Sequence, residues 1–197
     1  QLDIEMSFVK QKDVMRIAEN LIRKLFIESI EVDLGEIPVF DYDEALFRYG
    51  TDRPDLRFGL ELVDIGDLLL QSEFNVFGAP AKAKGSRVVA LRLPNGDRLS
   101  RKNIDDYTKF VGLYGAKGLA YIRIHDLAQG KKGLQSPILK FLSDEEIENI
   151  LSRCEVSNGD VIFFGADKSK VVNESMSSLR NKLAEDLDLY ASSWSSC

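Results

Sequence analysis

The segment GDVIFFGAD, residues 159–167, contains an unbroken apolar run between a glycine–aspartate pair and a closing aspartate. Such a run is typical of a strand that is buried on both of its faces. A buried strand also needs hydrogen-bonding neighbours for its backbone. Residues 159–167 therefore predict a sheet of several strands in which this segment has a central position.

The neighbouring segments supply the rest of that sheet and its helices. The strand-like segments are 73–77, 86–94 and 119–126, and the helical ones are 100–114, 136–153 and 168–188. Ser100 and Ser143 occupy N-cap positions, and Glu146 has capping-box spacing from Ser143. This order of elements predicts an α+β fold of two layers, with helices on one face of a mainly antiparallel sheet.

The N-terminal part has a different organisation. LDIEMSF, residues 2–8, alternates strictly, which predicts a half-buried strand with Asp3 and Glu5 on its polar face. Two acids on one strand face could bind an ammonium group or a cationic side chain, although paired surface acids are the more common case. The segments with helical periodicity are 11–29, 41–50 and 61–70.

The composition is that of a soluble globular protein, with 44% hydrophobic and 29% charged residues. The net charge of −6 disfavours non-specific binding to nucleic acid, which depends on clustered Lys and Arg. It does not exclude local positive patches. No apolar run approaches the ~20 residues that cross a bilayer. Cys154 and Cys197 indicate reduced thiols of a cytosolic protein rather than a disulfide. The start at Gln1 predicts a piece of a longer chain.

Residues for catalysis are scarce. Neither GxxxxGK[ST] nor GxGxxG occurs, so the sequence carries no phosphate-binding motif. His125 is the only histidine, and it is more typical of an exposed strand end than of an active site. Lys131, Lys132 and Lys140 could form a modest basic patch, although such lysines are more often solvated. The sequence contains no constellation of a nucleophile and a base, or of metal ligands. It therefore does not predict catalysis by this segment itself.

The stretch RYGTDRPDLRF, residues 48–58, is dense in charge and places Arg48, Arg53 and Arg57 beside two aspartates. Pro54 excludes a continuous helix through it. Two interpretations are open. The arginines brace a joint by pairing with nearby acids, which is the simpler interpretation, or they bind an anionic partner.

Six segments taken in order resemble those of bacterial aspartyl-tRNA synthetases. They are QLDIEMSF, VDLGEIPV, RYGTDRPDLRFGLEL, GAKGLAYIRI, SPILKFL and GDVIFFGAD. The resemblance extends from Gln1 to about Tyr190. It implies that 1–57 is the part of a class II catalytic core that follows motif 2, that 58–190 is the GAD insertion domain, and that 191–197 begins the return to the core.

The resemblance implies a parent ligase that activates aspartate with ATP and Mg²⁺ and then transfers it to tRNA. It also implies that this segment has no catalytic residue and binds no cofactor itself. Asp3 matches a core-strand aspartate that faces the aspartate pocket. Arg48, Arg53 and Arg57 lie where the family's core meets the insertion, so they either contact the acceptor end of tRNA or act as a hinge.

The implied partners are tRNA, held weakly by this segment, and the rest of the synthetase chain, in a cytoplasmic homodimer without membrane association. The alternative is a free-standing GAD-type module that binds RNA or protein without catalysis. The strand predicted at 2–8 favours the ligase, because a free-standing module has no need of it. Whether the parent charges aspartate tRNA alone or asparagine tRNA as well stays open.

Overall fold

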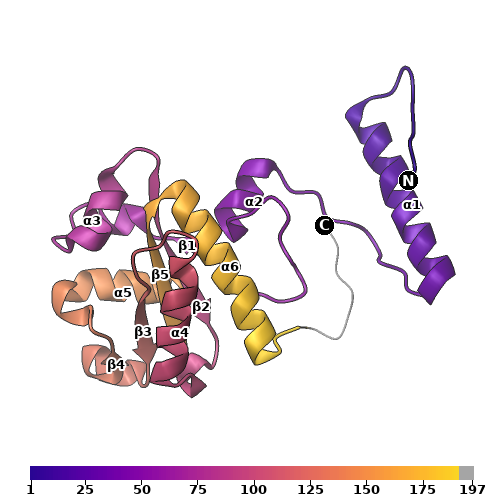
Figure 1. Cartoon of the computed structure of the whole chain (residues 1–197). Coiled ribbons are helices and arrows are strands. Elements are labelled where there is room, and N and C mark those ends of the chain that lie inside the picture. Colours follow the sequence, from indigo (N-terminus) through magenta and orange to yellow (C-terminus); the bar gives the residue numbers. More distant parts are fainter. Residues whose placement is uncertain (191–197) are drawn as a thin grey trace.

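A computed structural model of the chain describes residues 1–190. Its centre is a five-stranded antiparallel sheet with the strand order β1-β2-β5-β3-β4. Helices lie on both sides of this sheet, and one long N-terminal helix stands apart from it (Figure 1). The sheet therefore organises the part of the chain that follows the arginine-rich stretch.

The elements have the following bounds. The strands are β1 (Leu62–Asp64), β2 (Ser86–Leu93), β3 (Ala120–Ile124), β4 (Leu134–Gln135) and β5 (Val161–Lys168). The α-helices are α1 (Gln11–Ile30), α2 (Tyr42–Tyr49), α3 (Asn75–Lys82), α4 (Arg101–Gly112), α5 (Asp144–Arg153) and α6 (Ser169–Leu187). Short 3-10 helices occupy Gly66–Leu69, Gly96–Arg98, Leu127–Gly133 and Leu139–Phe141.

Strand β5 is the central strand, as its apolar run predicts. It pairs with β2 along its whole length, from Ser86 opposite Lys168 to Leu93 opposite Val161. Its other edge pairs with β3 over residues 161–164. Both pairings are antiparallel, so the predicted mainly antiparallel sheet is confirmed.

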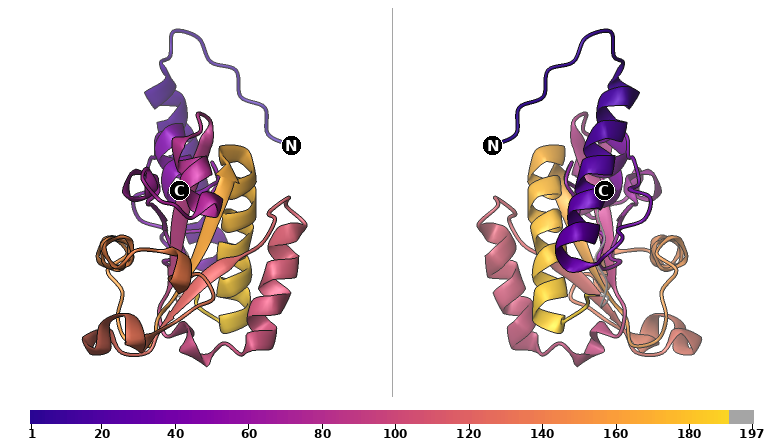
Figure 2. Two further views of the ribbon diagram at one scale, coloured as in Figure 1. Left: turned by 90° about the vertical axis from the view of Figure 1, so that its left-hand side faces the viewer. Right: turned by 90° about the vertical axis from the view of Figure 1, so that its right-hand side faces the viewer.

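Alternate residues of β5 enter two separate hydrophobic cores. Val161 and Phe163 pack with α4 and α6, whereas Ile162 and Phe164 pack with α3 and α5. The views in Figure 2 show these helices on opposite sides of the sheet. The α+β class is confirmed, but the prediction of helices on one face only is wrong, because α4 and α6 cover one face and α3 and α5 cover the other. The second face is not bare, because a central strand with apolar side chains on both sides needs cover on both.

Local capping signals place several helices correctly. The hydroxyl of Ser100 accepts a hydrogen bond from the Asn103 N–H, and Ser143 and Glu146 form the predicted capping box. Gly50 ends α2 with a φ of 73°. A Cβ atom at this glycine would lie 2.8 Å from the carbonyl oxygen of Asn173, so α2 and α6 meet closely at this point.

The predicted strand at 2–8 is wrong. Residues 1–6 have no regular structure, Ser7 and Phe8 form a bend, and no strand among residues 1–190 pairs with this segment. An isolated strand cannot satisfy its backbone groups, so alternation alone does not produce one. Asp3 and Glu5 are exposed, and they do not share a strand face.

Two further predictions assign the wrong type of secondary structure. The helix expected over 61–70 is strand β1 followed by a 3-10 turn, because Leu62, Val63 and Asp64 pair with β2. The strand expected over 73–77 is instead the start of α3, where Phe77 is buried against Phe164. In both places packing on the sheet overrides a weak local pattern.

Other predictions concern the thiols, membrane association and the final segment. Cys154 is buried and free, and burial raises the pKa of its thiol to about 12. Cys197 and the return segment predicted at 191–197 lie outside the described residues. Within residues 1–190, no helix combines the length and the apolar character required to cross a membrane.

Candidate functional site

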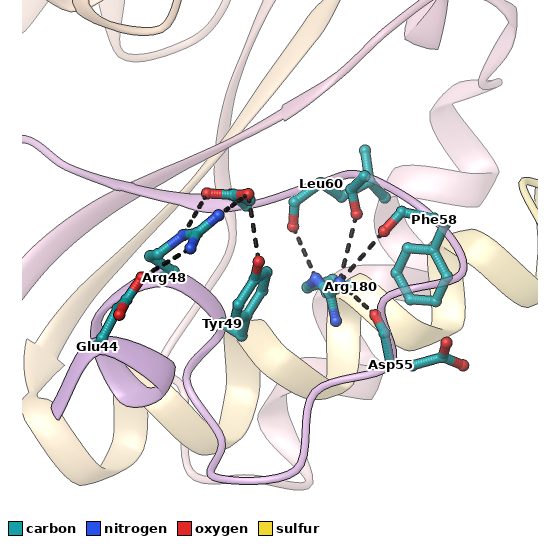
Figure 3. A network of polar contacts seen from close by, with 9 residues as sticks. Glu44, Arg48, Tyr49, Asp55, Phe58, Leu60 and Arg180 are labelled. Carbon is teal, nitrogen blue, oxygen red and sulfur yellow. Dashed lines mark hydrogen bonds and ion pairs between the residues drawn. The ribbon is translucent and has the colours of Figure 1, made fainter. Parts of the chain in front are cut away.

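The arginine-rich stretch lies against the last helix, α6, and Arg180 of that helix connects the two. Its guanidinium donates hydrogen bonds to the carbonyl oxygens of Leu60 at 2.8 Å and Asp55 at 2.6 Å. Longer bonds of 3.4 Å reach the carbonyls of Phe58 and Gly59. Figure 3 shows the side chain pointing into the curve of this loop. One side chain therefore fixes the path of the chain from residue 55 to residue 60.

Arg180 is only 1% exposed, which is unusual for a charged side chain. The rings of Tyr49 and Phe58 lie 4.9 and 4.4 Å from its guanidinium carbon. Burial lowers the pKa of Arg180, and the nearby Tyr49, Asp55 and Glu61 oppose that shift. A guanidinium remains charged in proteins, so this buried cation is stabilised by carbonyl dipoles and ring faces.

Arg48 forms the second part of the network. It binds Glu61 through two bonds, of 2.9 and 2.6 Å, and Glu44 through a third of 2.8 Å. The hydroxyl of Tyr49 donates to the same Glu61 at 3.3 Å. The hydrogen bonds with Arg48 lower the pKa of Glu61, although partial burial opposes the effect. Helix α2 is therefore tied to the segment that leads into β1.

Arg87 of β2 binds the C-terminal end of α2. It donates to the carbonyl oxygens of Leu46 at 3.1 Å and Phe47 at 3.0 Å, where α2 ends. It also binds the side chain of Asn173 at 2.9 Å and lies 3.4 Å from an oxygen of Asp64. We define the arginine junction as Arg48, Arg57, Arg87 and Arg180 with their partners. It joins α2 and the loop after it to β2 and α6.

The arginines of the stretch itself differ in their environments. Arg57 binds the carboxylate of Asp55 at 2.6 and 3.0 Å, and its guanidinium carbon lies 4.6 Å from the ring of Tyr190. These bonds raise the pKa of Arg57. Arg53 is exposed, and its side chain has no hydrogen bond or ion pair within the described part of the chain. The structure thus brings Arg48 and Arg57 into one network and leaves Arg53 facing solvent.

Asp3 lies far from this network in an exposed segment. Its described contact is with the side-chain amide of Gln1, at 3.0 Å. Nothing within residues 1–190 surrounds Asp3 to make a pocket. The role of Asp3 in binding aspartate stays a prediction.

The basic patch predicted at Lys131, Lys132 and Lys140 is partly engaged. Lys131 binds Asp144 at 2.8 Å, and the ammonium of Lys140 lies 4.8 Å from the ring of Phe141. Of these three lysines, only Lys132 has no partner among residues 1–190. The three lysines therefore do not form a set of free cations.

Arg87 and Arg180 are parts of the site that were not predicted from the sequence. A signal for Arg180 exists, because it follows Met176 by four residues and precedes Leu183 by three. This spacing places it on the apolar stripe of α6, where a charged residue needs an explanation. The signal cannot name its partners, since Leu60 is 120 residues away in sequence.

The described contacts of the arginine junction join α2 and the loop after it to β2 and α6. Its acids, Glu44, Asp55 and Glu61, are each bound by an arginine. No group of three or more His, Cys, Asp or Glu side chains within residues 1–190 could hold a metal ion. Arg53 is the cation of the stretch that remains available to an anion.

Comparison with known proteins gives two results. The GAD domain family matches residues 77–176. Over 195 residues the chain is 54% identical to proteins described as "Aspartate--tRNA(Asp/Asn) ligase" from the Corby and Philadelphia 1 strains of Legionella pneumophila. These alignments cover 98% of this chain and 33% of each relative, so the chain spans about a third of their length.

The two matches differ in extent. The GAD match covers β2 to β5 and part of α6, whereas the similarity to the ligases also includes α1, α2 and the arginine junction. The chain therefore belongs to the GAD domain family, and nearly all of it is similar to one continuous segment of aspartate–tRNA ligases.

Proposed function

We propose that this chain is the GAD-bearing segment of an aspartate–tRNA ligase, an enzyme that activates aspartate with ATP and transfers it to tRNA. The observation that carries the proposal is the identity of 54% over 98% of the chain. That similarity is not confined to the GAD domain, because it extends through the arginine junction and α1. The relatives' name includes asparagine tRNA, so both tRNAs are candidate substrates.

ATP and Mg²⁺ belong to the parent enzyme in this proposal. Activation of an amino acid needs cations around the phosphates. Within the described residues no side-chain cluster fits Mg²⁺, and all four arginines of the junction are engaged, whereas Arg53 of the neighbouring stretch is not. The segment alone is therefore proposed to be inactive. Its proposed setting is a cytoplasmic homodimer, and Asp3 is proposed to face the aspartate pocket only within the complete protein.

The alternative function is a free-standing module that binds RNA or protein. It is favoured by two hydrophobic cores that are built from residues 60–189 of this chain. Helix α1 opposes it, because that helix has no buried residue and exposes several large apolar side chains. A ligase core that covers α1 explains this exposure, and a module limited to the GAD domain does not.

The direct test is aminoacylation by the complete natural protein that contains this sequence. The protein is incubated with ATP, Mg²⁺, labelled aspartate and a transcript of aspartate tRNA, and acid-precipitable label is counted. The proposal predicts charging of the transcript that depends on ATP. Absence of charging, together with tight binding of RNA or another protein, would support the free-standing module.

A substitution of Arg53 tests whether the arginine-rich stretch contacts tRNA. In the complete protein, R53E should weaken tRNA binding by about three- to ten-fold and lower the salt dependence of binding by about one counterion. The matched control is R16E, which changes another exposed arginine, in α1, whose described partner is Asp13. Equal tRNA binding by wild type and R53E across a salt titration would assign Arg53 to the hinge.

A further inference from the structure

Five lysines meet at one end of the sheet. We call the set formed by Lys82, Lys84, Lys117, Lys168 and Lys170 the lysine end. All five side chains are exposed. The turn after α3 and the junction between β5 and α6 bring them together, because Ser86 pairs with Lys168 and the Ser169 N–H donates to the Gly85 carbonyl at 2.9 Å.

The lysine end has more positive charge than its neighbours neutralise. Lys117 lies 3.5 Å from an oxygen of Asp167, and Lys170 lies 3.9 Å from one of Glu174. Lys82, Lys84 and Lys168 have no anionic partner within residues 1–190. The sequence from 74 to 96 contains no acidic residue. In a chain with a net charge of −6, this end is a local positive region.

These cations do not serve the stability of the helix that begins among them. The first turn of α6 has no acidic residue, its N-cap is Lys168, and no side chain caps it. Positive side chains oppose the dipole at a helix N-terminus. Helix α5 of the same domain has the favourable arrangement, with Ser143 as its cap and acids in its first turn. The lysines around the start of α6 therefore point to an external anion.

We propose that the lysine end binds the phosphate backbone of tRNA. The proposal rests on the proposed function, which makes tRNA the polyanionic substrate of the complete protein. Five exposed ammonium groups on three adjoining segments, the turn after α3, the α4–β3 loop and the β5–α6 junction, match a chain of phosphates in charge. Lysine contacts of this kind position RNA without reading its sequence. No side chain caps the first turn of α6, so its N–H groups other than that of Ser169 add donors that suit a phosphate oxygen.

The test compares two triple variants of the complete natural protein. K82E/K84E/K168E reverses the three lysines of this set that have no partner. K102E/K132E/K140E reverses three exposed lysines elsewhere on the same domain and changes the net charge equally. Binding to a labelled transcript of aspartate tRNA is measured by fluorescence anisotropy at several salt concentrations. Aspartate-dependent exchange of pyrophosphate into ATP, which needs no tRNA, is measured in parallel, and thermal unfolding verifies folding.

The proposal predicts that K82E/K84E/K168E binds tRNA about ten-fold more weakly and loses about two to three counterions from the salt dependence. The control triple variant should bind within about two-fold of wild type. A neutral variant, K82Q/K84Q/K168Q, should show a smaller loss of the same kind, and it replaces the reversal variant if that variant unfolds.

Other outcomes separate this proposal from the proposed function. K82E/K84E/K168E could bind tRNA with the affinity and salt dependence of wild type while it still exchanges pyrophosphate. That result would overturn the proposal that the lysine end binds tRNA, and the ligase proposal would stand. Equal losses in both triple variants would also overturn it, because net charge alone would then explain the effect. If wild type binds tRNA without exchanging pyrophosphate, the ligase proposal fails. The binding data for the variants then still test whether the lysine end binds tRNA.

Discussion

Arg180 is the least exposed charged residue within residues 1–190. Its guanidinium is nearly inaccessible to water and bonds to the carbonyls of the loop between α2 and β1. Those carbonyls have to be satisfied where they are buried, so the arginine acts as an internal hydrogen-bond donor for a segment that has no regular structure of its own. Lysine cannot replace it fully, because it lacks the planar fork that reaches several oxygens.

We predict that R180M destabilises the chain by about 2–4 kcal/mol, since buried carbonyls lose charged donors. The measurement is the free energy of unfolding in urea. R153M is the matched control, because Arg153 forms an exposed ion pair with Asp67 and its loss should cost no more than about 1 kcal/mol. R180K should fall between R180M and wild type. Equal unfolding free energies for R180M and R153M would contradict this account of the junction.

The pair of Arg48 and Glu61 predicts a dependence of stability on pH. The bonds from Arg48 lower the folded-state pKa of Glu61 below its ordinary value of 4.5. The resulting stabilisation is present above that ordinary pKa and is lost as the pH falls through the folded-state pKa. The free energy of unfolding should therefore decrease on acidification below about pH 4.5, and E61Q should make this decrease shallower.

The control for this experiment is E148Q, since Glu148 is exposed and has no ion pair within the described residues. It should leave the acid slope of wild type unchanged. The slope in E61Q does not vanish, because arginines also lower the pKa of Asp55 and Asp67. Identical slopes for wild type, E61Q and E148Q would show that the carboxylate of Glu61 contributes nothing to folding.

At the scale of elements, two helices of similar length have opposite environments. Helix α6 has 19 residues and buries seven of them, whereas α1 has 20 residues and buries none. Helix α1 exposes apolar residues such as Leu25 and Ile30, at 51% and 49%. A helix without tertiary packing is marginally stable in water. The contrast predicts a large difference in their dynamics.

Hydrogen exchange tests this difference. In the 197-residue chain, amides of α1 should exchange about a hundred-fold or more faster than those of α6, because only α6 is protected by a core. In the complete natural protein, the proposed ligase core should slow exchange in α1. Equal protection of α1 and α6 in the 197-residue chain would show that α1 packs against something in this chain.

The elements that the sequence predicts correctly are those with strong local signals. The apolar run predicts strand β5, and the caps at Ser100 and Ser143 predict the starts of α4 and α5. Strand β1 and helix α3 are different, because the sheet decides them: Leu62 becomes a strand residue by pairing with Leu91. The strand predicted at 2–8 fails for the converse reason, since residues 1–190 offer it no partner.

The candidate site shows the same limit. The density of charge in residues 48–58 is visible in the sequence and marks the joint. Which arginine is buried, which is paired and which is free depends on contacts across the fold. Arg87 reaches Leu46 over 41 residues, and no local pattern predicts a contact of that kind.

For the whole molecule, the distribution of charge matters more than its sum. The chain is acidic, yet Arg53 and three members of the lysine end, Lys82, Lys84 and Lys168, have no anionic partner within the described residues. The cations of the arginine junction are already occupied by acids, carbonyls and rings. We therefore expect residues 1–197 to bind RNA weakly through a few surface contacts and to provide no cation for chemistry on ATP.

The most direct test of this account is aspartate-dependent exchange of labelled pyrophosphate into ATP, measured for the 197-residue chain and for the complete natural protein at equal concentration. We predict exchange by the complete protein and none above background by residues 1–197, whether or not tRNA is added. Exchange by the 197-residue chain would contradict the account, because an activating site would then exist within this segment. Failure of the complete protein to exchange would contradict the ligase proposal itself.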